Sequence, residues 1–402
     1  MSTSSVPRPE PAAPSGPLRR PGRPLVARHR MPDGAPAALA LFAAVRLAGI
    51  LVVITADHLA GHTLTRSLAH SWDSRWYLHI AAHGYGHLIW ITPSGAVQTD
   101  WAFFPLYPWL VRAALTVLPC TPGQAGLLVA WAAAGVAAYG LYLIGHHLYG
   151  RAAATALVAL WAVLPHSVEL TIAYTESLFA ALAVWSLYCL LKGRWLWAGS
   201  LAALAGLARP TGFAVAAALG ITAAHELLRR RGRAPAALWA GVLLAPLGWL
   251  GYVLWVGART GDLFRGYFTV QSAWDSRFDF GAGALRFLRL LFLYGGGVVY
   301  PAALLLVLLG VVLFGLLCLD RAPLALVVFA AVLVLLVLGG SGSFSSKPRF
   351  LLPAFPLLIP PARALARTWR ARPAQALLVG CALAAASLLY GAYVTVVAHS
   401  PL

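Results

Sequence analysis

Long apolar segments recur along nearly the whole chain, and they constrain its fold more than any other feature. A helix needs roughly 20 apolar residues to cross the hydrocarbon of a bilayer, and about eleven segments between residues 35 and 398 meet or approach that length. They do not alternate apolar and polar residues as the strands of a membrane barrel do. Hydrophobic residues make up 60% of the chain and charged residues only 10%, too few for a water-covered surface. We therefore expect an all-α membrane protein, a polytopic bundle of helices.

The predicted spans are separated by short polar connections and cover residues 35–56, 125–145, 152–174, 177–191, 196–210, 211–225, 236–256, 294–319, 322–338, 350–362 and 374–397. Three of them, 177–191, 196–210 and 350–362, are short for a full crossing. A further apolar segment, 103–118, contains Pro105, Pro108 and Arg112, so we expect it to lie in the outer interface rather than to span.

Basic residues indicate which connections face the cytoplasm. The net charge is +18, but Lys and Arg are clustered between apolar segments instead of forming a patch for nucleic acid. The clusters follow the positive-inside rule and comprise Arg19, Arg20, Arg23, Arg28, Arg30, Lys192, Arg194, Arg229, Arg230, Arg231, Arg233, Arg363, Arg367, Arg370 and Arg372. We expect a multi-pass protein of the cell membrane, with residues 1–34 as a disordered basic cytoplasmic tail and 35–398 as one transmembrane domain.

This topology puts two long polar loops, 57–100 and 257–293, on the extracytoplasmic face, the first bearing juxtamembrane helices. The first loop sets Asp73 among Trp72, Trp76 and Tyr77 and close to Arg75. A carboxylate in such surroundings can act as a general base. The alternative is that the aromatic residues form an interfacial belt and Asp73 caps a short helix. The tetrapeptide Trp-Asp-Ser-Arg occurs again at residues 274–277, without surrounding similarity that would indicate a repeat.

Five motifs occur in the order found in one family of membrane enzymes. They are Trp72-Asp73-Ser74-Arg75-Trp76-Tyr77 with Ala102-Phe103-Phe104-Pro105-Leu106-Tyr107-Pro108, then Tyr174-Thr175-Glu176-Ser177, Ala208-Arg209-Pro210-Thr211-Gly212, Gln271 with Trp274, and Arg349-Phe350-Leu351-Leu352-Pro353-Ala354-Phe355-Pro356. Together they resemble the mannosyltransferases related to the enzyme that adds the second mannose of GPI anchors. The resemblance extends over residues 72–356, and its specificity rests on the order of the motifs.

The resemblance implies a C-type glycosyltransferase (GT-C) fold and an enzyme that takes a sugar, here mannose, from a polyprenyl phosphate with inversion at the anomeric carbon. It assigns the base to Asp73. It implies substrate-binding roles for Trp72, Tyr77, Tyr107, Glu176, Arg209, Gln271, Trp274, Lys347 and Arg349. Ser74 and Arg75 depart from the small residues often found there in relatives, which puts the acceptor in doubt more than the base.

Alternatives remain at several positions. Asp100 is a second candidate base, and Glu176 is either an acceptor ligand or a helix cap. Arg46 lies within an apolar segment, where an unpaired charge is costly, so it should face a partner or a cavity.

We expect no metal or other cofactor. The four cysteines are scattered, and His79 and His83 lack a third ligand. The expected partners are a polyprenyl-phosphate sugar, membrane lipid and an acceptor that is a glycan, a lipid or a protein hydroxyl. The composition, rich in Ala, Arg and Gly, indicates a bacterial protein, in which GPI anchors are not expected.

Two other classes of protein fit the apolar pattern. A multi-pass transporter or lipid flippase also has many helices and intramembrane charges. Transporters often show two repeated halves, and we detect no such symmetry. A scaffold protein would leave the ordered motifs and the outer carboxylates unexplained.

Overall fold

The computed structural model describes residues 31–62 and 66–398, and within these nearly every apolar segment is helical. The predicted disordered tail falls almost entirely on residues 1–30, outside the described part. The helices are α1 Ala35–Leu59, α2 Arg66–Ala69, α3 Ser74–His83, α4 Leu106–Val117, α5 Pro122–Tyr149, α6 Arg151–Ala162, α7 Glu176–Leu191, α8 Trp195–Ala208, α9 Phe213–Arg229, α10 Ala236–Leu244, α11 Leu247–Thr260, α12 Gly266–Ser272, α13 Ala282–Tyr294, α14 Val299–Leu319, α15 Leu324–Gly339, α16 Ile359–Ala371 and α17 Pro373–Ala392.

Strands and tight turns are confined to the connections. Strands β1 Ile89–Ile91 and β2 Val97–Thr99 form an antiparallel hairpin in the first long loop, with Trp90 opposite Gln98. The 3₁₀ turns are Asp100–Ala102, Ser167–Leu170, Pro210–Gly212, Phe344–Leu351 and Phe355–Leu358, and α17 continues into a π-helical turn, Tyr393–Val397.

Six helical stretches in the described residues are long and apolar enough to cross a membrane: Ala35–Leu59, Pro122–Tyr149, Pro210–Arg229, Ala236–Thr260, Val299–Leu319 and Pro373–Val397. Five shorter apolar helices accompany them: Leu106–Val117, Arg151–Ala162, Glu176–Leu191, Trp195–Ala208 and Leu324–Gly339. The protein is thus a multi-pass membrane protein by its helices. Because length and composition support six spans, the predicted count of about eleven stays a prediction.

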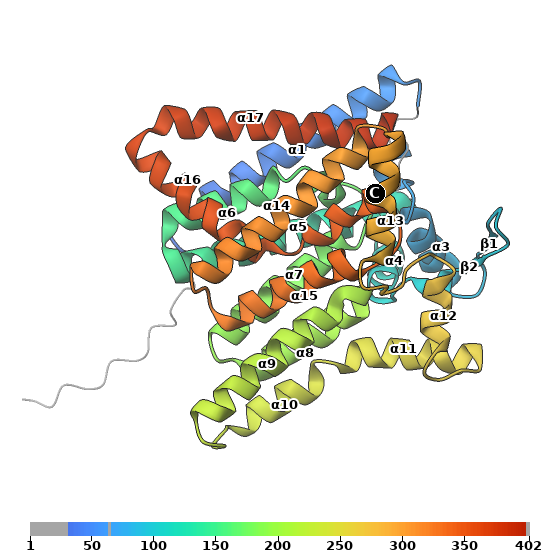
Figure 1. The fold of residues 1–402 in the computed structure, drawn as a ribbon, viewed down its shortest axis with the longest axis horizontal. Helices are drawn as coiled ribbons and strands as arrows, with labels where there is room; N and C mark the ends of the chain where they lie inside the picture. The colour runs from blue at the N-terminus through green and yellow to red at the C-terminus, as the bar shows by residue number, and fades with distance from the viewer. Residues whose placement is uncertain (1–30, 63–65, 399–402) are drawn as a thin grey trace, which may run out of the picture. The chain divides into compact units, whose positions relative to one another are not determined.

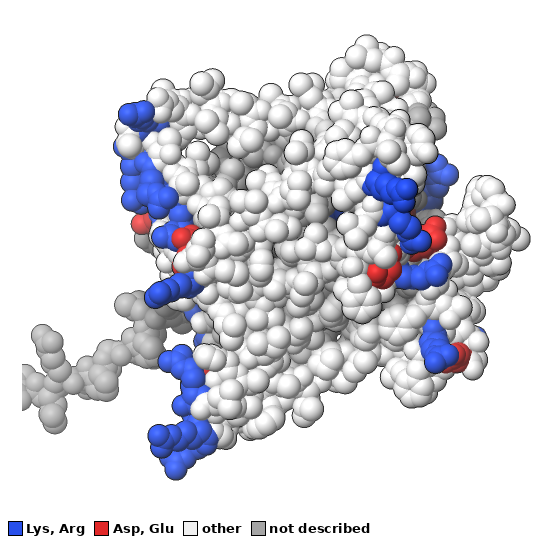
Figure 2. All heavy atoms as spheres, in the orientation of Figure 1, with Lys and Arg blue, Asp and Glu red and all other residues white. Residues whose placement is uncertain are grey.

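Within residues 33–62 and 66–398, the apolar helices run side by side, so their ends gather at two opposite edges (Figure 1). One edge holds α3, α4, α12, α13 and the β1–β2 hairpin. The other holds the α9–α10 and α16–α17 connections. Figure 2 shows mainly Lys and Arg side chains along that second edge and a mixture of acidic and basic side chains along the first, with a largely uncharged surface between them. This is the charge pattern of a protein that spans a bilayer.

Small residues let the interior helices approach closely. The helix α5 begins with a capping box, in which Thr121 and Gln124 bond reciprocally, and it packs its Ala and Gly residues against α6 and α7. The helices α8 and α10 cross at Gly199 and Gly241, where a Cβ on either glycine would meet the backbone of the other helix. Such contacts replace hydrophobic burial as the source of stability between helices in lipid.

The chain between α6 and α7 is not helical, which corrects the expectation of one span over residues 152–174. The helix α6 ends at Ala162, three residues before Pro165, because proline cannot continue the helical hydrogen bonding. Side-chain donors on other helices bond the carbonyl groups that are left without a helical partner. The Arg46 guanidinium of α1 donates to Ser167 O at 2.5 Å and also to Ala162 O. Arg46 therefore has a structural role, one of the two that the sequence left open.

Two other predicted spans are also interrupted by proline. The segment 236–256 is divided into α10 and α11 at Pro246. The segment 350–362 is two 3₁₀ turns followed by the start of α16, with Pro353 and Pro356 in the turn region. Each break follows from the missing proline N–H and from the restriction that proline places on the preceding residue.

Candidate active site

Asp73 lies immediately before α3 and forms an ion pair with Arg349. The Arg349 Nη1 atom is 3.1 Å from Asp73 Oδ2, and the two side chains are 13% and 25% exposed. Asp73 occupies the N-cap position of α3, but its carboxylate accepts no capping hydrogen bond. The capping role considered from the sequence is therefore not the one observed. A carboxylate that is partly open to solvent and opposite a cation is instead available for chemistry.

Arg349 lies in the 3₁₀ turn Phe344–Leu351, which follows α15. Its guanidinium packs over the rings of Tyr174 and Phe350, 5.9 and 5.1 Å from their centroids. Burial disfavours the charge on Arg349, but the carboxylates of Asp73 and Glu176 outweigh it and hold the pKa of the guanidinium above its usual value. Arg349 therefore carries a fixed positive charge at the site.

A second ion pair, between Glu176 and Arg209, lies next to the first. Glu176 opens α7 and Arg209 follows α8, and both side chains are buried. Arg209 also donates to Thr175 Oγ1 at 3.0 Å and packs 5.8 Å from the centroid of the Phe350 ring. Phe350 thus contacts both arginines. We call Asp73, Arg349, Glu176, Arg209 and the Phe350 ring the ion-pair site.

Two tyrosines hold the loop segments of the ion-pair site together. The Tyr174 hydroxyl accepts a hydrogen bond from the Asp73 N–H at 3.1 Å. The Tyr77 hydroxyl lies 3.4 Å from Thr175 Oγ1, and burial raises the pKa of Tyr77 to about 12. Burial also raises the pKa of Tyr174, so both hydroxyls stay neutral at physiological pH. Tyr174 bonds the Asp73 backbone and Tyr77 lies beside Thr175, and neither adds charge to the site.

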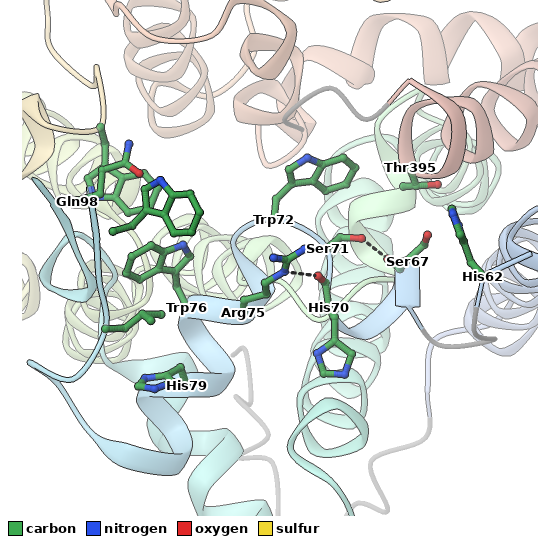
Figure 3. A pocket seen from close by; sticks show the side chains of 13 residues that line it. His62, Ser67, His70, Ser71, Trp72, Arg75, Trp76, His79, Gln98 and Thr395 are labelled. Atoms are coloured by element: carbon green, nitrogen blue, oxygen red, sulfur yellow. Dashed lines mark hydrogen bonds between the residues drawn. The ribbon is translucent and has the colours of Figure 1, made fainter. Parts of the chain in front are cut away.

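A cavity of about 710 Å³ adjoins the Asp73 backbone. It is lined by His62, Ser67, His70, Ser71, Trp72, Arg75, Trp76, His79, Leu88, Trp90, Gln98, Trp274 and Thr395, and we call it the Trp cavity. Figure 3 shows Trp72 and Arg75 in its middle, with Trp76, His79 and Gln98 on one side and Ser67, His62 and Thr395 on the other. Its volume is in the range of pockets that hold small-molecule ligands.

Trp72 stands between the ion-pair site and the Trp cavity. Its backbone has φ of +36°, close to the left-handed region that a tryptophan rarely adopts. Strained backbone of this kind persists where the surrounding structure enforces it. Here the strained residue, Trp72, lines the cavity together with Ser71, and the next residue, Asp73, forms the ion pair with Arg349.

Two candidate residues of the second long loop lie beside these sites without contacting Asp73. Trp274 lines the Trp cavity and packs edge to face against Trp76, with ring centroids 4.9 Å apart. Gln271 donates from Nε2 to Ala102 O at 2.9 Å and to the Tyr267 hydroxyl at 2.8 Å. Gln271 therefore fastens the second loop to the first.

Two other candidates have their polar groups bonded within the protein. The Tyr107 hydroxyl donates to Gly126 O at 2.9 Å, and its ring is completely buried. Lys347 is also buried, and its Nζ donates to Val337 O at 2.6 Å and Gly340 O at 2.7 Å. Lys347 thus satisfies carbonyl groups at the end of α15. The structure does not bring either residue into contact with Asp73.

The alternative base, Asp100, is fully buried and accepts hydrogen bonds from the N–H groups of Gly86 and His87. It closes the loop after α3 and has no free face. The rings of His79 and His83 lie 4.6 Å apart. Within residues 31–62 and 66–398, no group of three or more His, Cys, Asp or Glu side chains is arranged to hold a metal ion.

Sequence reasoning missed the parts of the site that act through packing. Tyr174 and Thr175 belong to the Tyr-Thr-Glu-Ser motif, and Phe350 follows Arg349 in another, so the motifs contained the signal. Nothing in the sequence distinguished these residues from structural neighbours of the charged ones.

Comparison with known proteins bears on the fold. No family model matches the sequence, and no curated protein matches it. Among solved structures, the Archaeoglobus fulgidus oligosaccharyltransferase in its apo form is similar with a TM-score of 0.52 and 15% identity, over 90% of this chain and 56% of that one. ArnT from Cupriavidus metallidurans in the apo state is similar with a TM-score of 0.51 and 15% identity, over 90% of this chain and 76% of ArnT.

These similarities show that the protein shares its fold with the oligosaccharyltransferase and ArnT, which agrees with the kind of fold that the resemblance in the sequence implied. The chain spans little more than half the length of the oligosaccharyltransferase. The narrower relation to the GPI second-mannose family is not tested by these structures and stays a prediction.

Proposed function

We propose that the protein is an inverting glycosyltransferase that uses a polyprenyl-phosphate sugar and acts on the extracytoplasmic side of the cell membrane. The ion pair between Asp73 and Arg349 carries this proposal, because it sets a candidate base beside a fixed cation in a fold shared with glycosyltransferases. Mannose as the sugar, and a relation to the GPI second-mannose family, rest on the sequence motifs alone. The proposed topology has about eleven spans and a cytoplasmic N-terminus, consistent with the positive-inside rule.

In the proposed reaction, an acceptor hydroxyl loses its proton to Asp73 while its oxygen attacks the anomeric carbon of the sugar. A bond forms between that oxygen and the anomeric carbon. The bond from the carbon to the phosphate oxygen breaks on the opposite face, which inverts the centre. The polyprenyl phosphate leaves with the electron pair, and Asp73 later releases the proton to water.

Arg349 has two roles in this reaction. In the empty site it neutralises Asp73. When the donor binds, its phosphate competes for the guanidinium, which frees the carboxylate to act as a base. The same guanidinium then stabilises the charge that grows on the leaving phosphate. Glu176 forms an ion pair with Arg209 next to it, so this second pair is neutral as a whole and holds both side chains in place beside Arg349.

The proposed chemistry requires no metal ion, because the leaving group is polyprenyl phosphate, a single phosphate monoester whose charge Arg349 can stabilise. We expect sugar transfer to continue in the presence of a chelator of divalent cations. Loss of transfer on chelation, with recovery on adding back Mg²⁺ or Mn²⁺, would show that this part of the proposal is wrong.

The test uses membranes that contain the protein, a polyprenyl phosphate carrying radiolabelled mannose, and the variant Asp73→Asn. Removing a general base typically slows a reaction by about 100-fold or more, so we expect at least that loss of transfer. Arg349→Gln should lose about as much, because it removes the charge opposite the leaving group. Asp275→Asn is the matched control, since Asp275 is exposed and occurs in the same tetrapeptide, Trp-Asp-Ser-Arg.

The outcomes separate the classes of protein. Transfer that survives in Asp73→Asn removes Asp73 from the role of base. Equal loss in Asp73→Asn and Asp275→Asn would point to a general effect of charge in the outer loops. Movement of the intact lipid-linked sugar across the membrane, without transfer to any acceptor, would favour a flippase.

A further inference from the structure

The walls of the Trp cavity are suited to sugar rings. Four indole side chains line it: Trp72, Trp76, Trp90 and Trp274. Sugar rings present apolar C–H faces that pack against flat aromatic surfaces, while their hydroxyl groups need hydrogen bonds at the edges. Among the described residues of the lining, Leu88 is the one aliphatic hydrophobic residue, so their apolar surface is mainly aromatic. This composition favours a carbohydrate over a lipid chain.

Several polar groups of the cavity have no partner among the described residues and can bond a ligand. Arg75 is exposed, and its Nε donates to His70 O at 3.2 Å, whereas its two terminal nitrogens have no protein partner among the described residues. His79 Nδ1 and Trp274 Nε1 are buried and also have no hydrogen-bond partner in the described part of the chain. Such donors suit a ligand rich in oxygen acceptors.

The charge of the lining is positive or neutral. Arg75 carries a fixed positive charge, and His62, His70 and His79 contribute basic rings. Among the described residues that line the cavity, none is Asp or Glu. The carboxylate behind the wall, Asp57, is bonded to Ser67 at 2.6 Å and to His62 at 3.3 Å, so it faces those groups. The cavity is thus complementary to an anionic group.

The cavity lies beside the proposed base. Ser71 and Trp72 precede Asp73, and Arg75 and Trp76 follow it, and all four line the cavity. The ion pair with Arg349 leaves a quarter of the Asp73 side chain exposed. A ligand in the Trp cavity therefore sits against the segment of chain that carries this carboxylate.

We propose that the Trp cavity binds the acceptor and that this acceptor is a glycan bearing an acidic group, a phosphate or a carboxylate. The inference rests on the proposed function and narrows its substrate class. The sugar rings stack on the indole side chains, and Arg75 bonds the acidic group. The departure at Ser74-Arg75 noted in the sequence then acquires a function, because Arg75 is the residue that selects charge.

A direct test measures binding without any donor, using the full-length protein in lipid nanodiscs and isothermal titration calorimetry. The main probe is a tetrasaccharide of alternating uronic acid and hexosamine, compared with the same tetrasaccharide after reduction of its carboxylates to alcohols. A second pair is mannose 6-phosphate and mannose, and inorganic phosphate is measured alone. We expect each acidic sugar to bind about tenfold more tightly than its neutral counterpart, as a charge-assisted hydrogen bond provides.

Two variants and their matched controls locate the effect. Arg75→Gln should abolish the preference for the acidic sugar, whereas Arg277→Gln, the same position of the second Trp-Asp-Ser-Arg, should keep it. Trp90→Ala should weaken both members of a pair equally, by several-fold, since it removes a stacking surface. Trp109→Ala is its control, because Trp109 is similarly exposed but lies on α4, away from the cavity.

The inference is overturned if neutral and acidic sugars bind alike, if Arg277→Gln acts as strongly as Arg75→Gln, or if inorganic phosphate binds as well as the acidic sugars. Tighter binding of a Ser/Thr peptide than of either sugar would overturn it in favour of a protein acceptor. Charge-selective binding through Arg75 in a protein that transfers no sugar would refute the proposed function alone. Transfer to neutral and acidic acceptors alike would refute this inference alone.

Discussion

Glu176 and Arg209 are paired with almost no access to solvent, whereas the pair of Asp73 and Arg349 is partly open. This difference separates structural from chemical charges. A buried pair is costly to break, because the remaining partner keeps its charge without water around it. A partly open pair can exchange its partner for a ligand.

We predict that Arg209→Met destabilises the folded protein by about 3–5 kcal/mol, since it leaves Glu176 buried and unpaired. The measurement is thermal unfolding of the purified protein in detergent, monitored as the loss of its monodisperse peak in size-exclusion chromatography. The double variant Glu176→Gln with Arg209→Met should recover part of the loss, because no charge is then left without a partner. If the double variant is less stable than Arg209→Met, the unpaired Glu176 charge is not the cause of the lost stability.

The four charged residues of the ion-pair site were all predicted from sequence motifs, but their pairing was not. Motif order indicates that Asp73, Glu176, Arg209 and Arg349 belong to one site, whereas the choice of partner depends on how α7, α8 and the turn after α15 pack. Lys347 shows the same limit. It stands two residues from Arg349, yet it turns toward the carbonyl groups at the end of α15.

At the level of elements, the segment between α6 and α7 is the least regular part of the interior. Its backbone groups lie among apolar helices, where an unsatisfied carbonyl costs several kcal/mol. Arg46 from α1 and Trp131 from α5 donate to Ser167 O and Thr171 O. Ser387 from α17 adds a second hydrogen bond to Leu164 O, which also accepts one from the Ser167 N–H within the segment. The break after α6 is therefore stable only because three other helices surround it.

We predict that Arg46→Met greatly reduces the amount of folded protein, because the carbonyl groups of Ala162 and Ser167 lose their donor together. Fluorescence-detected size exclusion of tagged protein from membranes measures this directly. Arg112→Met is the control, since Arg112 is an exposed arginine on the apolar helix α4. Equal yields of the two variants would contradict the role given to Arg46.

The boundaries of the longest helices were predicted well from sequence, because an apolar stretch of the length needed to span a bilayer can hardly be anything but a helix. The breaks were predicted poorly. Pro165, Pro246 and Pro353 were visible in the sequence, but proline is tolerated within membrane helices when neighbours satisfy the backbone. Only the packed structure shows at which of them the helix actually ends.

At the level of the whole molecule, the two ends of the helices differ in their charged residues. The hairpin and α3, which follows Asp73, lie at the end where acidic and basic residues are mixed, and the α9–α10 and α16–α17 connections lie at the other end, where Lys and Arg predominate (Figures 1 and 2). From the positive-inside rule we therefore predict that the candidate active site faces the extracytoplasmic side.

We predict that single cysteines in a cysteine-free background react with an impermeant thiol reagent at Ser94→Cys and Ser276→Cys in intact cells, but not at Arg233→Cys until the membrane is opened. All three positions are exposed, so a difference in labelling reports the side of the membrane. The reverse pattern would put the candidate site in the cytoplasm and would exclude a donor presented on the outer face.

The hydrogen bond from the Ser387 hydroxyl to Leu164 O has a consequence for biosynthesis. The donor belongs to the last long helix of the described chain, more than two hundred residues after the carbonyl group that it contacts. During translation, the segment between α6 and α7 can form its local hydrogen bond from the Ser167 N–H to Leu164 O as soon as it is made, but it gains the bond from Ser387 only after α17 has been synthesised. A nascent chain arrested before α17 should be recognised by membrane quality control, because its irregular stretch has not yet found its final contact.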